Sequence, residues 1–299
     1  MLQVLVTSLK NRQGLPAPRV GGGLVGMVAR ILRWQLAARL WPGDLVFDFV
    51  SGSVLVGRKG LTLASSHFYF GFANWHISPF ILHALRRDDR FIDIGANIGV
   101  DTILGAAVRQ AHVVACEPSS ATFRYLQRNV RLNGVDDRVT LRQIAIGENS
   151  GSIAFETNRD ALNRVVTQPL REASHEIVPV ETLDAVAGEE GADILKIDVL
   201  GYEPFVLRGG QETLRNSRLR AIIIGVQRRA RDFGQDPLES SRMLSAFGFQ
   251  PVFYDVSTRR LVPIQSPDVN QYVLFVRDPD EMQRRLSNAE SFELFGTRF

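Results

Sequence analysis

The sequence of 299 residues is long enough to bury a substantial core, as one large domain or as one domain with an extension. Apolar residues make up 45% and charged residues 22%, which is typical of a soluble globular protein. The net charge of +3 comes without a basic run, so charge gives no support for a nucleic-acid partner. The single cysteine, Cys116, excludes a disulfide framework within the chain and suits a reducing, cytoplasmic compartment.

The N-terminal region precedes any regular strand–helix pattern. Residues 1–22 are rich in Gly and Pro and predict a flexible lead-in, and their opening stretch lacks the pattern of a secretory signal. The apolar segment 24–41 is interrupted by Arg30, Arg33 and Arg39, so we expect no transmembrane segment. Because these arginines do not line one helical face, a helix packed on the main domain is favoured, and peripheral membrane contact stays open.

Residues 23–88 predict an extension that packs on the core. After the helix, residues 45–60 indicate two strands around a Ser-Gly turn, and residues 72–85 indicate a second helix. The extension is thus expected to consist of helices and a β-hairpin.

Residues 89–280 alternate short apolar strands with helical patterns. This alternation indicates an open, largely parallel sheet with helices on both faces. Two final strands, separated by a short stretch, predict an antiparallel hairpin at one edge, and residues 281–299 are left as a C-terminal tail. The expected strands are 90–95, 112–118, 138–147, 193–199, 219–226, 250–256 and 270–278, with helices over 119–134 and 236–249.

A glycine-rich turn follows the first of these strands, in "FIDIGANIGVDTI" (residues 91–103). In open α/β sheets, ligands bind outside the carboxyl ends of the strands. Gly95 lets the backbone turn sharply and approach a ligand, and Gly99 lets the next helix pack closely on the strand. The G-x-x-x-G spacing differs from the G-x-G-x-x-G of a pyrophosphate cradle.

The second strand ends with Glu117 and Pro118, about 20 residues beyond the glycines, where such folds place an acid that binds ribose. A carboxylate at this point can accept hydrogen bonds from both ribose hydroxyls and disfavours a 2′-phosphate. The alternative is a charge at the N-terminus of the helix that "EPSS" opens.

Four segments together resemble the FkbM family of S-adenosylmethionine-dependent methyltransferases: residues 91–103, 115–118, 178–184 and 195–203. The resemblance covers roughly residues 45–278. It implies a class I, Rossmann-like methyltransferase fold with a seven-stranded, mostly parallel sheet and an antiparallel terminal hairpin. It also implies an enzyme that methylates a hydroxyl of a sugar, a glycolipid or a secondary metabolite.

The resemblance further implies roles for individual residues. The turn after the first strand would line the methionine part of S-adenosylmethionine, Glu117 would hold the ribose, the end of the third strand would border the adenine, and Asp198 would face the transferred methyl group. Leu200 and Gln227 stand where the family commonly has acids, which concerns the acceptor side. The cofactor-binding residues are thus expected to be Asp93, Gly95, Ala96, Asn97, Gly99, Glu117, Pro118, Gln143, Ile144 and Asp198.

The stretch "LKIDVLGYEP" (residues 195–204) carries the candidate catalytic groups. Lys196 and Asp198 lie two apart on a strand and share a face, so mutual pairing is the simplest way to bury both. We expect Asp198 to be the base or the orienter for an acceptor hydroxyl, with Lys196 keeping it ionised. For Glu203, capping of free N–H groups and a role in the site both stay open. His76 is a further candidate base.

Cofactors and partners follow from these assignments. We expect S-adenosylmethionine as the cofactor, a small molecule or glycan as the acceptor, and no nucleic acid as a partner. No His or Cys residues have the spacing of a zinc site. A divalent ion bound by Asp198 is possible, but nothing in the sequence indicates one. Residues 74–80, 157–177 and 228–234 are expected to choose the acceptor. Two alternatives remain: a catalytically altered cofactor-binding or scaffold protein, and an NAD-dependent oxidoreductase. The oligomeric state is open.

Overall fold

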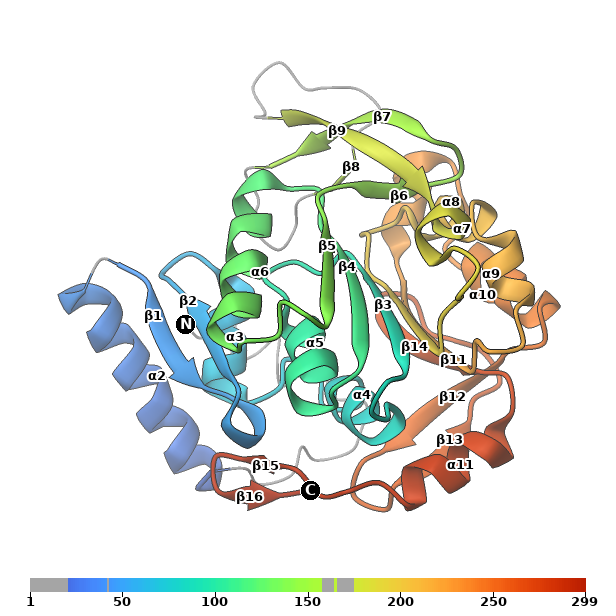
Figure 1. Ribbon diagram of the computed structural model, residues 1–299. Helices are drawn as coiled ribbons and strands as arrows, with labels where there is room; N and C mark the ends of the chain where they lie inside the picture. The colour runs from blue at the N-terminus through green and yellow to red at the C-terminus, as the bar shows by residue number, and fades with distance from the viewer. Residues whose placement is uncertain (1–20, 42, 158–163, 166–174) are drawn as a thin grey trace.

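A computed structural model describes residues 21–41, 43–157, 164–165 and 175–299. Its centre is an eight-stranded sheet, which Figure 1 shows between two layers of helices. In spatial order the strands are β13 (Arg260–Pro263), β12 (Gln250–Asp255), β14 (Gln271–Val276), β11 (Ala221–Val226), β10 (Ile194–Ile197), β3 (Arg90–Ile94), β4 (His112–Cys116) and β5 (Val139–Arg142).

The strand directions confirm the predicted Rossmann-like sheet. β11, β10, β3, β4 and β5 run parallel, and β14 lies antiparallel between β11 and β12. Every residue of β10 and β11 is buried, as expected for central strands with both faces covered. The sheet has one strand more than the seven expected, because the mostly exposed β13 forms a hairpin with β12 at the edge.

Alternate residues of the strands supply two cores, one on each face of the sheet. Phe91 and Val113 belong to the core under the first group of helices, whereas Ile92 and Val114 belong to the core under the second. The first group consists of α4 (Ser78–Ala84), α5 (Val100–Ile103), η2 (Leu104–Val108), α6 (Ser120–Leu132) and α11 (Pro279–Ser287). The second consists of α7 (Leu183–Ala187), α8 (Glu203–Arg208), α9 (Gln211–Arg215) and α10 (Glu239–Ala246).

A smaller sheet sits beyond the carboxyl ends of the main strands, at the top of Figure 1. The expectation of one strand over 138–147 is wrong: the chain bends after β5, and its second half pairs with β9 instead of continuing beside β4. Residues 158–163 and 166–174 of the insert expected to choose the acceptor lie outside the described residues. The four strands are β6 (Ala145–Gly147), β9 (His175–Thr182), β7 (Gly151–Glu156) and β8 (Arg164–Val165).

The expected N-terminal helix and β-hairpin are present. Asn129 of α6 and Asn133, which caps its C-terminus, accept hydrogen bonds from the backbone of β2 (Val54–Gly57), and these bonds tie the hairpin to the core. The helix expected over 72–85 is shorter and begins at Ser78, and α3 was not predicted. The elements are α2 (Gly23–Leu40), β1 (Leu45–Asp48), η1 (Val50–Gly52), β2 (Val54–Gly57) and α3 (Thr62–Phe70).

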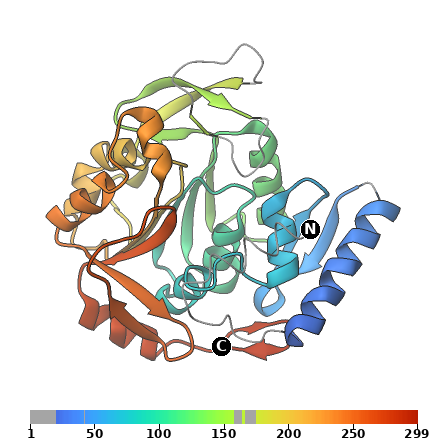
Figure 2. The same ribbon diagram turned by 180° about the vertical axis from the view of Figure 1, so that it is seen from behind.

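The C-terminal residues expected as a tail are folded onto the molecule. After α11, β15 (Glu293–Leu294) and β16 (Thr297–Arg298) form a short hairpin, and Leu286 and Leu294 are fully buried. Figure 2 shows this hairpin beside the beginning of α2, where Gly21 donates a hydrogen bond to Thr297. Of the predicted lead-in, all but residues 21 and 22 lie outside the described residues. Within the described ranges no helix is both long enough and apolar enough to cross a bilayer.

Candidate active site

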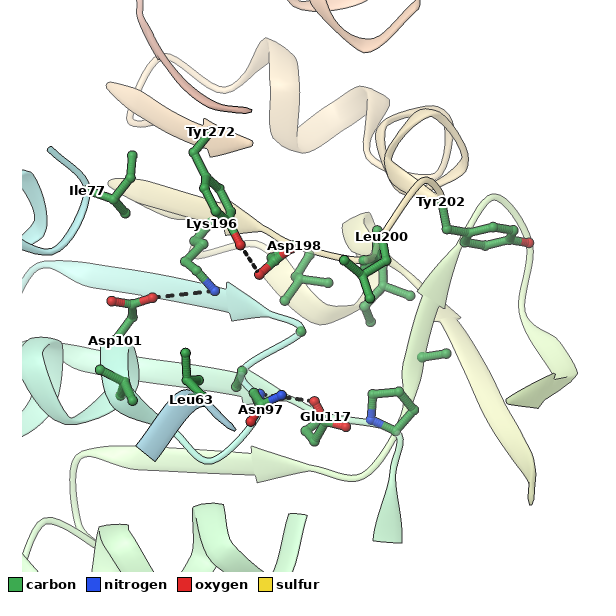
Figure 3. Close-up of a pocket in the computed structure, with 18 of the residues that line it drawn as sticks. Leu63, Ile77, Asn97, Asp101, Glu117, Lys196, Asp198, Leu200, Tyr202 and Tyr272 are labelled. Carbon is green, nitrogen blue, oxygen red and sulfur yellow. Dashed lines mark hydrogen bonds and ion pairs between the residues drawn. The ribbon is translucent and has the colours of Figure 1, made fainter. Parts of the chain in front are cut away.

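A cavity of about 290 Å³ opens at the carboxyl ends of β3, β4 and β10. This is where ligands bind in open α/β sheets, and the volume is close to the lower end of small-molecule sites. Figure 3 shows that its walls come from the main sheet, from the N-terminal extension and from the segment after β10.

The glycine turn after β3 forms the floor of the cavity. Gly95 has a φ of +76°, and a Cβ atom there would lie 2.0 Å from the carbonyl oxygen of Asp198. The N–H groups of Gly95 and Ala96 both donate to the carbonyl of Cys116, which fixes the turn against β4. Glycine is therefore required at 95, because a side chain would separate the ends of β3 and β10.

Glu117 follows β4 and lines the same cavity. Its carboxylate accepts hydrogen bonds from the backbone N–H of Asn97 (3.0 Å) and of Ser119 (2.9 Å). Burial raises the pKa of Glu117 to about 7, although these two donors favour the ionised form. A carboxylate has about four lone-pair positions, so two remain for a ligand's hydroxyl groups.

Lys196 lies at the centre of a buried charge cluster. Its Nζ atom is 3.1 Å from Asp93 and 3.5 Å from Asp101. Burial opposes its charge, but the carboxylates around it outweigh burial and raise the pKa of Lys196. The expected pair with Asp198 is therefore not the pair that forms, because parallel pairing of β10 with β3 sets Lys196 beside Asp93.

Asp101 was not singled out from the sequence, although it lies in the glycine motif. It is on the first turn of α5, lines the cavity and accepts a hydrogen bond from Ser78. Burial raises the pKa of Asp101 to about 6, while Lys196 acts in the opposite direction. Asp93 and Asp101 therefore share the ammonium group of Lys196. Its single positive charge cannot balance both carboxylates when both are ionised.

Asp198 comes directly after β10 and faces the cavity (Figure 3). Its Oδ2 atom accepts a hydrogen bond of 2.5 Å from the phenol of Tyr272 on β14. Its Oδ1 atom is buried and finds no hydrogen-bond partner among the described residues. A buried carboxylate oxygen without a donor is costly, so this atom is available to a ligand's donor.

Tyr272 was missed by the sequence analysis, which had no signal linking it to Asp198, 74 residues earlier. Burial and the neighbouring Asp198 carboxylate raise its pKa well above the usual value, so its hydroxyl keeps the proton that it donates. Tyr272 fixes one oxygen of Asp198, and the other oxygen is left without a donor among the described residues.

Glu203 lies behind the cavity and is almost fully buried. It accepts hydrogen bonds from the backbone N–H groups of Val199 (3.3 Å) and Gly201 (2.8 Å), just ahead of α8. Of the two alternatives for Glu203, the structure supports the capping role. The loop that it holds includes Leu200, which lines the cavity and has a φ of +53°.

The rest of the wall is mainly apolar. It comes partly from segments 74–80 and 157–177, which were expected to choose the acceptor, and partly from residues that the sequence did not connect with the site. Leu63, His67 and Ile77 contribute from the N-terminal extension, and Phe155 and Val165 from the smaller sheet. Burial lowers the pKa of His67 to about 4, and its Nδ1 atom contacts the carbonyl of Gly71. His67 is therefore neutral near pH 7.

Other predicted residues lie away from the cavity wall. Asp93 is fully buried beneath it, Gly99 packs against Leu126, and Gln143 is exposed. His76 lies beside the wall, 3.4 Å from the carbonyl of Tyr272, with its ring against Phe253. The predicted residues that line the cavity are Gly95, Ala96, Asn97, Glu117, Pro118, Ile144, Lys196 and Asp198.

The cavity's donors and acceptors fit a nucleoside cofactor with a short polar tail. Glu117 offers acceptors for ribose hydroxyls, Ile144 offers an apolar surface, and the turn at Gly95 leaves room for close approach. Within the described ranges, no three His, Cys, Asp or Glu residues are grouped so that they could hold a metal ion.

The parallel strand order, the antiparallel β14 and a site at the strand ends define a Rossmann-like protein of the class I methyltransferase type. The chain belongs to the family described as the methyltransferase FkbM domain, whose model matches residues 93–253. This match includes the glycine turn, Glu117, Lys196 and Asp198 and ends before Tyr272.

Two curated relatives are similar to part of the chain. "Methyltransferase 1" of Beauveria bassiana is 32% identical over 147 residues, 41% of this chain and 59% of that protein. The "2-O-methyltransferase NoeI" of Sinorhizobium fredii is 29% identical over 151 residues, 44% of this chain and 61% of that protein. The chain thus spans about three fifths of the length of each relative.

Two solved structures are also similar to part of the chain. TYW2 of M. jannaschii in complex with AdoMet has a TM-score of 0.41 and 17% identity, over 78% of this chain and 84% of that chain. Precorrin-6y C5,15-methyltransferase of Geobacter metallireducens has a TM-score of 0.37 and 13% identity, over 67% of this chain and 84% of that chain.

Proposed function

We propose that this protein is an S-adenosylmethionine-dependent O-methyltransferase that acts on a hydroxyl group of a small-molecule or glycan acceptor. The observation that carries the proposal is the buried Oδ1 atom of Asp198, which has no partner in the described part of the chain and belongs to a residue that lines the same cavity as Glu117. Membership of the FkbM methyltransferase family supports the type of reaction.

Residues on one side of the cavity hold the cofactor in this proposal. Glu117 accepts hydrogen bonds from the ribose hydroxyls, Ile144 packs on the adenine, and the turn at Gly95 lies against the methionine part. S-adenosylmethionine supplies an electrophilic methyl group on a sulfonium centre when it is bound. Asp101 and Lys196 place a partly compensated charge cluster beside this side of the cavity.

Asp198 acts on the acceptor. Its Oδ1 atom accepts the hydrogen bond of the acceptor hydroxyl and receives its proton as the oxygen gains the methyl group. Tyr272 orients the carboxylate by donating to Oδ2, so that Oδ1 keeps one direction. Positioning of the hydroxyl by such a fixed group supplies a large part of the acceleration in transfers of this kind.

A hydroxyl acceptor has independent support from the relative NoeI, whose name describes a 2-O-methyltransferase. The cavity wall includes Ile77 and Leu200, and Leu200 is two residues from Asp198, so the acceptor group that enters has an apolar face. Sugar rings and many secondary metabolites combine hydroxyl groups with such a face. A cytoplasmic location accords with the single reduced cysteine.

A methyl-transfer assay with a panel of glycans and hydroxylated metabolites tests the activity. We expect S-adenosylhomocysteine to form in the presence of a hydroxylated acceptor and not in the presence of its deoxy analogue. Calorimetry with S-adenosylmethionine, S-adenosylhomocysteine and NAD separates the alternatives. Binding of NAD in place of the other two would favour an oxidoreductase. Binding of S-adenosylmethionine without turnover on the panel would favour a scaffold role. Leu200, at a position that is commonly acidic in the family, is the feature that supports this second alternative.

A further inference from the structure

An apolar ridge runs along the outer side of α2. Leucine or valine recurs every fourth residue from Leu24 to Leu40, and because each step turns by about 40°, the row winds through about 160° around the helix. The 18 residues of α2 make the ridge about 27 Å long. The exposed fractions are 70% for Leu24, 43% for Val28, 62% for Leu32, 59% for Leu36 and 75% for Leu40.

The ridge is not needed to attach α2 to the rest of the protein. The helix buries Ile31 and Trp34, and Trp34 packs edge-on against Phe47 and Tyr69. Leu36 lies about 160° from Trp34 around the helix, so the C-terminal part of the ridge is opposite these contacts. Arg30 also points inward, where it donates to the carbonyls of Tyr69 and Gly21. Figures 1 and 2 both show α2 at the outer edge of the molecule, so the face opposite these contacts points to solvent.

The charges on this exposed face are of one sign. The segment 23–41 contains no Asp or Glu, and Arg33 and Arg39 are both exposed. Each arginine lies three residues from Leu36, so the two fall about 60° to either side of it around the helix. Among the described residues, neither arginine has an ion-pair partner. Trp41, which follows the helix, is 62% exposed.

We propose that α2 lies in the surface of an anionic lipid bilayer and holds the protein there. Leu32, Leu36 and Leu40, which span about 80° around the helix, enter the boundary between head groups and acyl chains. Arg33 and Arg39 meet lipid phosphates on either side, and Trp41 lies at the level of the head groups. The helix extends along the membrane and does not cross it.

Charge complementarity favours this occupant over a second copy of the chain. A two-fold pairing along the ridge would bring the arginines of both copies together, with no acidic residue on either helix to compensate them. An anionic bilayer supplies the missing negative charge along the entire ridge. A single protruding helix also suits a deformable lipid surface, which can close around it. The proposal is independent of the chemistry in the cavity.

Vesicle flotation of the purified full-length protein tests the proposal. One set of vesicles is phosphatidylcholine alone, and the other contains about 30% phosphatidylglycerol, close to the anionic surfaces that attract basic segments. We expect binding to the anionic vesicles that weakens as the salt concentration rises. In L32Q/L36Q, loss of two apolar side chains should lower the partition coefficient on the order of a hundredfold, since about 1.4 kcal/mol per side chain is tenfold.

Charge and control variants complete the experiment. R33Q/R39Q should lose about tenfold or more on anionic vesicles and lose its dependence on salt. The matched control is I177Q/V262Q, which changes exposed apolar residues on β9 and β13 and should bind like the unchanged protein. All variants are checked by thermal unfolding, since solvent-exposed positions should leave the fold unaffected.

Two results would overturn the proposal. One is the absence of binding to anionic vesicles at low salt, or equal binding by L32Q/L36Q. The other is light scattering that shows a dimer without lipid, which L32Q/L36Q converts to monomer while neither protein floats with vesicles. That second result would make the ridge an interface between two copies.

Discussion

The two sides of the cavity are held together in different ways. On the side that we assign to the cofactor, Glu117 is fixed by two backbone N–H groups. One belongs to Asn97 in the neighbouring turn, and the other belongs to Ser119, two residues further along the chain. On the side that we assign to the acceptor, Asp198 is fixed by the side chain of Tyr272, 74 residues away. The cofactor side therefore depends on local backbone geometry, and the acceptor side depends on contacts between distant side chains.

The two sides of the cavity therefore differ in how freely their side chains can be replaced. Backbone donors remain when side chains change, so the cofactor side can stay constant while other residues differ. The acceptor side includes Leu200, at a position where the resemblance to the family implies an acid, and Ile77 of the N-terminal extension lines the same cavity. The part of the site that meets the acceptor is thus built from the less constrained residues.

The largest expected effect tests the acceptor side. In Asp198→Asn the proton acceptor is lost, so turnover should fall by about 10²–10⁴-fold. The affinity for S-adenosylhomocysteine, measured by calorimetry, should change by less than about threefold because the cofactor side is untouched. Asp137→Asn, at an exposed acid, is the control. Turnover near that of the unchanged protein would contradict the role of Asp198.

Removal of the buried cation tests the contact between β10 and β3. In Lys196→Met, Asp93 and Asp101 lose their common partner, so the free energy of unfolding in urea should fall by about 3–5 kcal/mol near neutral pH. The loss should be smaller at pH 5, because burial already raises the pKa of Asp101 to about 6 and protonation removes the uncompensated charge. Lys59→Met, at an exposed lysine, should change little; an equal effect in both variants would argue against the buried cluster.

A single methyl group tests the close approach of the glycine turn. In Gly95→Ala the new Cβ atom meets the carbonyl of Asp198, so we expect a loss of about 3 kcal/mol in stability together with weaker cofactor binding. Gly134→Ala is the matched control, because Gly134 also has a positive φ but has no atom within 4 Å of the built Cβ. It should cost about 1 kcal/mol and leave binding unchanged. Equal losses of stability in the two variants would mean that the positive φ, and not the contact with Asp198, causes the loss in Gly95→Ala.

The smallest expected effect concerns pH on the cofactor side. Burial raises the pKa of Glu117 to about 7, so its ionised fraction rises from about one tenth at pH 6 to about nine tenths at pH 8. The affinity for S-adenosylhomocysteine should rise by about tenfold over this interval, because the carboxylate accepts more hydrogen bonds than the neutral acid. Glu117→Gln should flatten the profile, and a slope that survives in this variant would exclude Glu117 as its origin.

The same group affects the stability of the protein without ligand. A carboxyl whose pKa is higher in the folded protein than its ordinary 4.5 stabilises the fold below that value and loses this contribution as the pH rises toward 7. Glu117→Gln should therefore remove a part of the decline in stability between pH 4.5 and 7, measured by urea unfolding at fixed ionic strength.

The sequence by itself determined most of the central sheet and the place of the glycine turn and Glu117 at the strand ends. Continuous apolar strands, the glycine turn and Glu117 are short-range features, and a parallel sheet brings strand ends to one edge. The possible membrane contact of α2 depends on both sequence and structure. In the sequence, the three arginines argued against a helix that lies on a membrane. In the structure, Arg30 points inward, and an apolar ridge is left between Arg33 and Arg39.

Only the tertiary structure decided which charges meet and which strands leave the main sheet. Strand order and register set Lys196 beside Asp93 and Tyr272 beside Asp198, and no local pattern encodes contacts over 103 or 74 residues. The bend after β5 places the two halves of one expected strand in two different sheets. It too depends on which strands they pair with, β4 for the first half and β9 for the second. Local preferences act within a few residues, whereas pairing and burial depend on the complete fold.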